Sequence, residues 1–192
     1  MKKTLPSLLG MIALLFTLQA MAQKKNMTWT TKSDKAKELA SKGAAHMKNI
    51  EFAQAYEYFK DALALDPDFT VPLVLMANIT EGETKKVYAE KAIKSAANKT
   101  EGEKLFASTV APGNTREINR PAWAKLHSMF PDGTMIGLFY VFSLDKPAEQ
   151  LPVVDDYIKR FPGEACFYNI MAIYTCRKKR IQPWQKHILK NI

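Results

Sequence analysis

The sequence contains few side chains whose type and spacing could perform chemistry. Its three histidines, His46, His127 and His187, stand far apart. Metal sites and catalytic dyads need such groups in a short, spaced motif, and neither a Cys-x-x-Cys pair nor a recognisable Ser/His/Asp arrangement occurs. We therefore expect no catalytic residue, no metal ligand and no cofactor, and we interpret the chain as a non-enzyme.

The two cysteines and the adjacent carboxylates Asp155 and Asp156 support the same interpretation. Cys166 and Cys176 are ten residues apart, which is roughly 15 Å of rise on one helix and too far for a disulfide. Asp155 and Asp156 are adjacent, so on a helix they point to different faces. We interpret this pair as part of a solvated surface.

A function must then come from the elements that build a surface, and the first clear element begins at Ser33, a good helix cap. Gly43 lies inside the helical pattern that follows. Because glycine costs a helix roughly 1 kcal/mol relative to alanine, its presence predicts that another helix approaches closely there. Small and apolar residues share this face: Ala36, Leu39, Ala40, Gly43, Ala44 and Met47.

The stretch "EFAQAYEYFKDALALDPDF" predicts the partner helix, after a short turn at 48–51. Ala55 and Ala62 fall on one face, where small side chains permit close antiparallel packing against the Gly43 helix, and Phe59 fills the space beside them. Asp66-Pro67 ends the helix, because proline disfavours the helical conformation in the residue before it.

The same pattern returns after 34 residues, which indicates a repeat. The shift carries Gly43 to Ala77 and Ala55 to Ala89. It predicts a second helix pair at 71–80 and 83–97, with Gly82 in the turn.

With this period the chain resembles tetratricopeptide repeat (TPR) proteins. The matching signature positions of the first unit are Leu39, Gly43, Phe52, Ala55, Phe59, Ala62 and Pro67. Two positions depart from the family: His46 replaces an aromatic residue, and Glu101 stands at the proline position of the second unit. The resemblance implies an all-α fold, an alpha-alpha superhelix of antiparallel helix pairs, with two such pairs at 33–102.

Beyond residue 102 the match weakens, but we expect divergent helical repeats over 103–180. Thr100 and Glu103 predict a capping box, and Pro121 is expected at the first position of a helix. The apolar stretch 134–144 fits a buried strand by composition. We favour a buried helix, because the Phe-Pro stop at 130–131 recurs at 161–162 after another helical pattern.

The final residues do not complete the repeat pattern. We expect Pro183 to interrupt the partner helix of the last unit, which leaves a basic tail at 181–192. No Asp or Glu follows Glu164, so much of the chain's excess of basic residues, 28 Lys and Arg against 19 Asp and Glu, lies near its end. Two alternatives remain open here: the tail folds back as a cap, or the chain is truncated or frameshifted relative to longer relatives.

The first 22 residues predict a secretory signal peptide. Lys2-Lys3 precedes an apolar run, and Ala20-Met21-Ala22 forms an A-x-A cleavage site, which is the three-part pattern of such signals. A single membrane anchor is the alternative, but the run is short for a span. We expect an exported protein, periplasmic or secreted, with no membrane span after processing. This leader with the repeats is similar to exported repeat proteins of Bacteroidetes-type bacteria.

The resemblance implies that the first helix of each pair lines a concave groove. The groove residues expected from the family's register, leaving aside the small Ala40 and Ala44, are Lys37, Met47, Lys48, Val71, Val74, Asn78 and Glu81. The family's carboxylate clamp is disfavoured, because Ala40 and Ala44 stand where Lys and Asn are needed. We expect a protein–protein interaction module or scaffold that binds a peptide or partner helix.

The alternative hypothesis is a partner with many negative charges. An anionic polymer, nucleic acid or acidic polysaccharide, could bind the basic tail, where Trp184 and His187 stand among lysines. Such binding would depend on phosphate or sulfate neutralisation and on stacking. We rank it second, and nucleic acid in particular is disfavoured.

Overall fold

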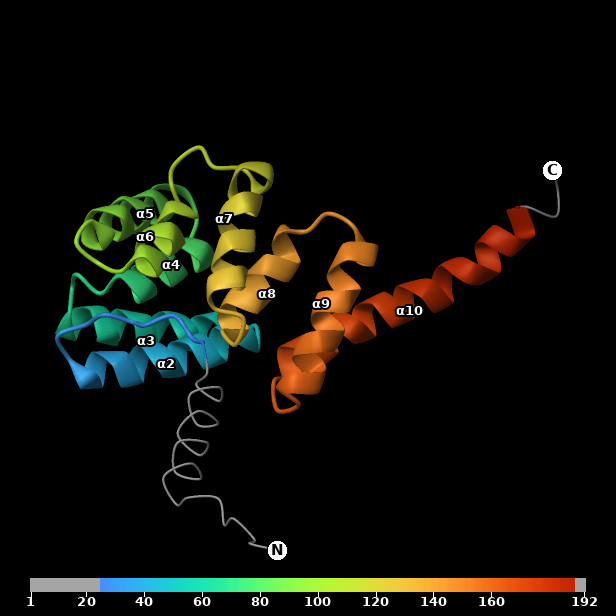
Figure 1. Ribbon diagram of the computed structural model, residues 1–192, viewed down its shortest axis with the longest axis horizontal. Coiled ribbons are helices and arrows are strands. Elements are labelled where there is room, and N and C mark those ends of the chain that lie inside the picture. The colour runs from blue at the N-terminus through green and yellow to red at the C-terminus, as the bar shows by residue number, and fades with distance from the viewer. Residues whose placement is uncertain (1–24, 189–192) are drawn as a thin grey trace, which may run out of the picture.

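The computed structural model describes residues 25–188, with side chains through Cys176. Throughout this part of the chain the regular structure is helical (Figure 1), which confirms the predicted all-α class. The helices are α2 (Asp34–Lys48), α3 (Phe52–Leu65), α4 (Thr70–Ile79), α5 (Gly82–Ala96), α6 (Glu101–Ser108), α7 (Arg116–Met129), α8 (Thr134–Ser143), α9 (Pro147–Arg160) and α10 (Ala165–Ile188).

Neighbouring helices pack as pairs, and the pairs stack into a curved array. The pairs α2/α3 and α4/α5 make the most extensive contacts. Helix α2 also contacts α4 and α8, and α4 contacts α6, so the first helices of successive pairs share one side of the array. We call this side the inner face. Toward the end of the chain, α10 extends away from the other helices (Figure 1).

The first pair forms as its residue spacing predicts. The Ser33 side chain caps α2 by accepting a hydrogen bond from the Ala36 N–H at 3.1 Å. Gly43 permits a close contact, because a Cβ atom built on it would lie 2.5 Å from Cε1 of Phe59. Phe59 therefore packs directly on Gly43, and Ala55 and Ala62 are fully buried, as expected for small residues of this interface.

Contacts between a small residue and an aromatic ring recur in the later pairs. A Cβ on Gly102 in α6 would lie 2.6 Å from the Phe130 ring, and one on Gly137 in α8 would lie 2.2 Å from the Tyr157 ring. Because Gly137 has no side chain, the buried Tyr157 ring of α9 packs directly against the backbone of α8. The divergent half of the array therefore packs by the same principle as the first pair.

Several local predictions of the second half are confirmed. Thr100 and Glu103 form the capping box at the start of α6. The apolar stretch 134–144 forms helix α8 with Leu144 as its C-cap, rather than a strand, and Phe130 and Phe161 are the C-caps of α7 and α9.

Two predictions about prolines are wrong. Pro121 lies inside α7, which begins five residues earlier at Arg116, because Thr115 caps it by accepting from the Ile118 N–H. Pro183 does not end the last helix, since α10 continues to Ile188. A proline removes one helical hydrogen bond, and the remaining bonds of a long helix can hold it together across that gap.

Two buried clusters form the core. The larger joins α2 to α8, with Phe59, Phe69 and Phe106 among its fully or almost fully buried side chains. The smaller joins α8, α9 and α10 around Tyr157 and Phe167. Within residues 25–188 no helix is both long and apolar enough to cross a membrane.

Candidate functional site on the inner face

An extended N-terminal segment, residues 25–32, occupies part of the inner face. Its start pairs with the loop before α8, where the Lys25 N–H donates to the Asp132 carboxylate at 2.7 Å and the Asp132 N–H donates to the Lys25 carbonyl at 3.3 Å. Its end reaches Asp66, next to the start of α2. The segment therefore runs back along α2, from the loop before α8 to the end of α3.

Glu103 is the central contact of this segment. Its side chain is fully buried, yet its carboxylate accepts from the Thr30 N–H at 2.8 Å and the Thr30 hydroxyl at 2.7 Å. It also accepts from the Thr100 N–H and hydroxyl, at 3.3 and 3.0 Å. A buried carboxylate is costly unless its oxygens are hydrogen-bonded, so the segment helps to satisfy this group.

Asp66 holds the end of the segment in a similar way. It is 4% exposed and accepts from the Thr31 hydroxyl at 2.6 Å and the Lys32 N–H at 3.0 Å. Burial acts to raise the pKa of Asp66, but these two hydrogen bonds, another from the Asp68 N–H and the charge of Lys99 outweigh it, so the pKa lies below its ordinary value. Asp66 is therefore held in the charged form that accepts these bonds.

Two apolar side chains anchor the segment between its polar contacts. Met27 is buried beside Gly102, and the Trp29 ring meets the Phe69 ring edge-on at 6.4 Å. Asn26 and Thr28 alternate with them and are exposed, as expected for an extended chain.

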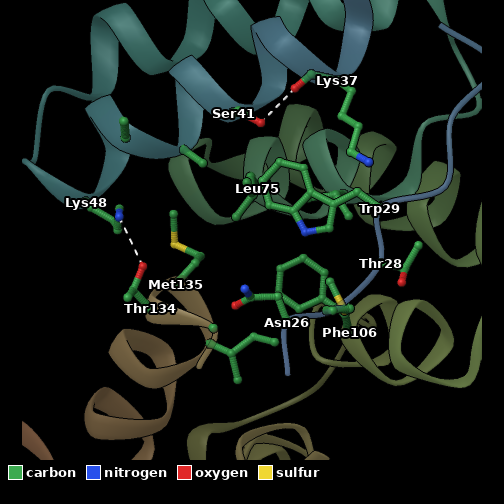
Figure 2. A pocket seen from close by; sticks show the side chains of 16 residues that line it. Asn26, Thr28, Trp29, Lys37, Ser41, Lys48, Leu75, Phe106, Thr134 and Met135 are labelled. Carbon is green, nitrogen blue, oxygen red and sulfur yellow. Dashed lines mark hydrogen bonds between the residues drawn. The ribbon is translucent and has the colours of Figure 1, made fainter. Parts of the chain in front are cut away.

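A cavity of about 470 Å³ lies beside this segment. Figure 2 shows the Trp29 and Phe106 rings at its centre, with Lys37 and Lys48 of α2 on different sides. Asn26 and Thr28 line it from the segment, and Val71 and Leu75 line it from α4. No Asp or Glu is among its lining residues.

A second, more apolar cavity of about 320 Å³ lies between the end of α2, α8 and α10. We call it the α8/α10 groove. Four large apolar side chains that line it are markedly exposed: Ile50 at 68%, Phe52 at 47%, Phe142 at 54% and Ile173 at 56%. Cys166 also lines it but is buried, and burial raises the pKa of its thiol, which opposes thiolate formation.

The structure brings several of the sequence-predicted groove residues to these two cavities. Lys37, Lys48 and Val71 line the first, and Met47, Lys48 and Asn78 line the α8/α10 groove. Val71 and Met47 are buried, whereas Lys37 and Asn78 are exposed.

The other two predicted groove residues lie elsewhere. Val74 is fully buried and lines neither cavity. Glu81 is an exposed residue at the start of α5, where it serves as the N-cap without a side-chain hydrogen bond, and it too lines neither cavity.

Lys48 forms an ion pair that links the first helix pair to the later helices. Its ammonium donates to both carboxylate oxygens of Glu164, at 2.7 and 2.5 Å, and to the Thr134 hydroxyl at 3.1 Å. Lys48 belongs to the first pair and Glu164 immediately precedes α10, so this ion pair joins the first helix pair to the start of the last helix. For Lys37, no carboxylate lies within ion-pair distance among residues 25–176.

The sequence did not predict that residues 25–32 pack on the helices, nor which residues hold them there. Met27 and Trp29 lie in the mainly polar stretch 23–32, and their spacing of two is the only local signal for an extended, half-buried chain. Glu103 and Asp66 were interpreted as a helix cap and a helix stop. Those roles are correct, but each carboxylate also binds a residue far away in sequence.

Two sequence predictions fall on residues about which the structure gives no side chains. The signal peptide at 1–22 lies outside the described residues, and so do the side chains of the basic tail at 181–192. Among the described residues, no group of three or more His, Cys, Asp or Glu is placed to hold a metal ion. Comparison of the chain with protein-family models, curated proteins and solved structures gave no match.

Proposed function

We propose that this chain is a non-enzymatic interaction module, exported from the cytoplasm, that binds a peptide or a partner helix on the inner face of a TPR-like helix array. The observation that carries the proposal is the α8/α10 groove, where four large apolar side chains are exposed together. Exposed apolar surface that is gathered around a concave site is typical of a binding surface.

The shape and chemistry of the groove favour a helical or extended apolar partner. Its walls come mainly from α8 and α10, together with the end of α2, the turn into α3 and Asn78 of α4, and an amphipathic helix can place its apolar face between such walls. Lys48 and Asn78 lie at the groove among the apolar residues, where polar groups would orient a bound chain. Export is proposed because of the leader pattern in residues 1–22.

A capture experiment with matched variants tests this proposal. The processed chain would be immobilised and exposed to envelope extract of the source organism, and Phe142→Ser would be compared with Ile118→Ser. Both side chains are more than half exposed, at 54% and 59%, but only Phe142 lines the groove. We expect Phe142→Ser to lose the captured protein and Ile118→Ser to retain it.

The same experiment can contradict the proposal. Equal capture by the wild-type chain and the Phe142→Ser variant would show that the groove is not the binding surface. Equal loss by both variants would indicate non-specific adhesion through exposed apolar residues. Circular dichroism of each variant would first establish that the helices are intact.

A further inference from the structure

The N-terminal segment is bound in a way that other peptides could reproduce. Two of its contacts involve backbone N–H groups two residues apart, Thr30 to Glu103 and Lys32 to Asp66. In an extended chain, N–H groups at this spacing point in the same direction. The two buried carboxylates therefore form acceptors along one edge of an extended peptide, and these backbone contacts do not depend on its sequence.

Side chains add selectivity to this backbone recognition. Met27 and Trp29 occupy two apolar positions beside Gly102 and Phe69. The hydroxyls of Thr30 and Thr31 donate to the same two carboxylates as the backbone. The site thus selects an apolar residue, an aromatic residue two positions later, and then two hydroxyl residues.

The segment does not fill its site. The cavity of about 470 Å³ remains beside it, bounded by the exposed residues Asn26 and Thr28 on one side and by α2 and α4 on another. A longer apolar side chain at either position would remove more of the cavity wall from water, and burial of apolar surface is favourable. An extended chain that fits the site better than this segment is therefore physically available.

We infer that the inner face is a binding site for an extended peptide of a partner protein, and that residues 25–32 are its displaceable occupant in the free chain. The existence of a natural partner rests on the proposed function, whereas the site itself rests on the contacts above. The partner peptide has the order apolar, any residue, aromatic, hydroxyl, hydroxyl, with a larger apolar side chain at the position of Thr28. The N-terminal segment competes with it and lowers its apparent affinity.

A peptide-binding experiment tests this inference. The probe is a fluorescein-labelled peptide of residues 23–33, titrated with the complete processed chain and followed by fluorescence anisotropy. In the protein, Trp29→Ala weakens the internal competitor and leaves Glu103, Asp66 and the helices in place. We expect the probe to bind this variant about tenfold or more tightly than the wild-type chain, because a larger fraction of the sites is free.

Changes in the peptide test its selectivity without affecting the protein. The probe with Trp29→Ala should bind the Trp29→Ala protein at least about tenfold more weakly than the parent peptide, an affinity ratio that corresponds to about 1.4 kcal/mol. A double change of Thr30→Val and Thr31→Val should also weaken binding. The probe with Thr28→Leu should bind more tightly. If the Trp29→Ala protein is not folded by circular dichroism, Thr30→Val in the protein serves as the weakened competitor.

Three outcomes would overturn the inference. The first is equal affinity of the probe for wild-type and weakened-competitor proteins. The second is undiminished binding of the Trp29→Ala peptide. The third is a dimer of the wild-type chain that the probe dissociates, which would assign the site to a second copy of this chain instead of a partner protein.

The result is distinguishable from failure of the proposed function. If the probe does not bind but Phe142-dependent capture succeeds, this inference fails and the proposed function stands. If the probe binds as expected but no protein is captured through the α8/α10 groove, that groove is not the binding surface of the proposed function, and the peptide site beside the N-terminal segment remains.

Discussion

The ring of Phe59 lies directly against Gly43, so close that a Cβ atom on the glycine would be 2.5 Å from Cε1 and 2.7 Å from Cδ1 of the ring. Phe59 is fully buried, and the interior around it is closely packed, so its ring has little room to move aside. This contact sets the distance between α2 and α3, and through α2 it positions Lys37 and Lys48 at the first cavity.

We predict that Gly43→Ala destabilises the protein by about 1–3 kcal/mol, the usual cost of overpacking. Alanine would otherwise favour the helix by about 1 kcal/mol, so a loss of stability reports the clash. The measurement is chemical denaturation, with Gly163→Ala as control, because a Cβ there meets nothing within 4 Å. A stabilised Gly43→Ala protein would contradict the close contact.

Ala62→Leu tests the same interface from α3. Ala62 is fully buried, so the larger side chain should lower the free energy of unfolding by about 1–3 kcal/mol. Ala64→Leu is the matched control, because Ala64 is on the same helix and exposed. An unchanged thermal midpoint for Ala62→Leu would mean that α2 and α3 pack in another register.

Lys48 and Lys37 should differ in their effect on stability although both line the first cavity. Lys48→Met leaves the half-buried Glu164 carboxylate without its cation and should cost about 1–3 kcal/mol. Lys37→Met should change stability by less than about 0.5 kcal/mol, as is usual for exposed sites. Thermal melts of both variants measure this difference. If the costs are equal, the Lys48–Glu164 ion pair does not stabilise the contact between the first helix pair and the start of α10.

His127 should make the fold sensitive to mild acid. Burial and the nearby Arg160 charge lower the pKa of His127, only partly offset by Asp156, and among the residues that the structure describes its Nε2 has no hydrogen-bond partner. The unfolded chain therefore binds a proton more readily than the folded chain, with an unfolded pKa of about 6.5. Stability should fall as the pH drops below that value.

The measurement is the melting temperature between pH 7 and pH 5. Tyr140 stacks on the His127 ring at 4.5 Å, so His127→Phe keeps an aromatic ring there while removing the titrating group. We expect the melting temperature of this variant to vary less with pH over this range. An equal dependence in both proteins would assign the acid sensitivity to other groups.

The processed protein should begin at Gln23, directly after Ala20-Met21-Ala22. N-terminal sequencing of the protein from the source organism checks this prediction. Such a start would leave two residues before Lys25, the first residue of the described segment. A soluble cytoplasmic form that retains Met1 would contradict export.

The helices and their first pairing could be predicted from the sequence because they depend on local patterns. The spacing of Gly43, Ala55, Phe59 and Ala62 specifies which faces meet, and the caps at Ser33 and Thr100 involve residues only three positions apart. Pro121 does not begin its helix, because Thr115 caps α7 six residues earlier through a side-chain hydrogen bond.

The inner face was decided only by the tertiary structure. Glu103 and Thr30 are 73 residues apart, and Asp66 and Thr31 are 35 apart, so no periodicity of the sequence connects them. The sequence determined that Trp29 is an aromatic residue in a polar stretch and that Glu103 can cap a helix. Only the packing of the helices brings Trp29, Thr30 and Glu103 to one surface. There the buried carboxylate of Glu103 needs hydrogen-bond donors, and these come from a distant part of the chain.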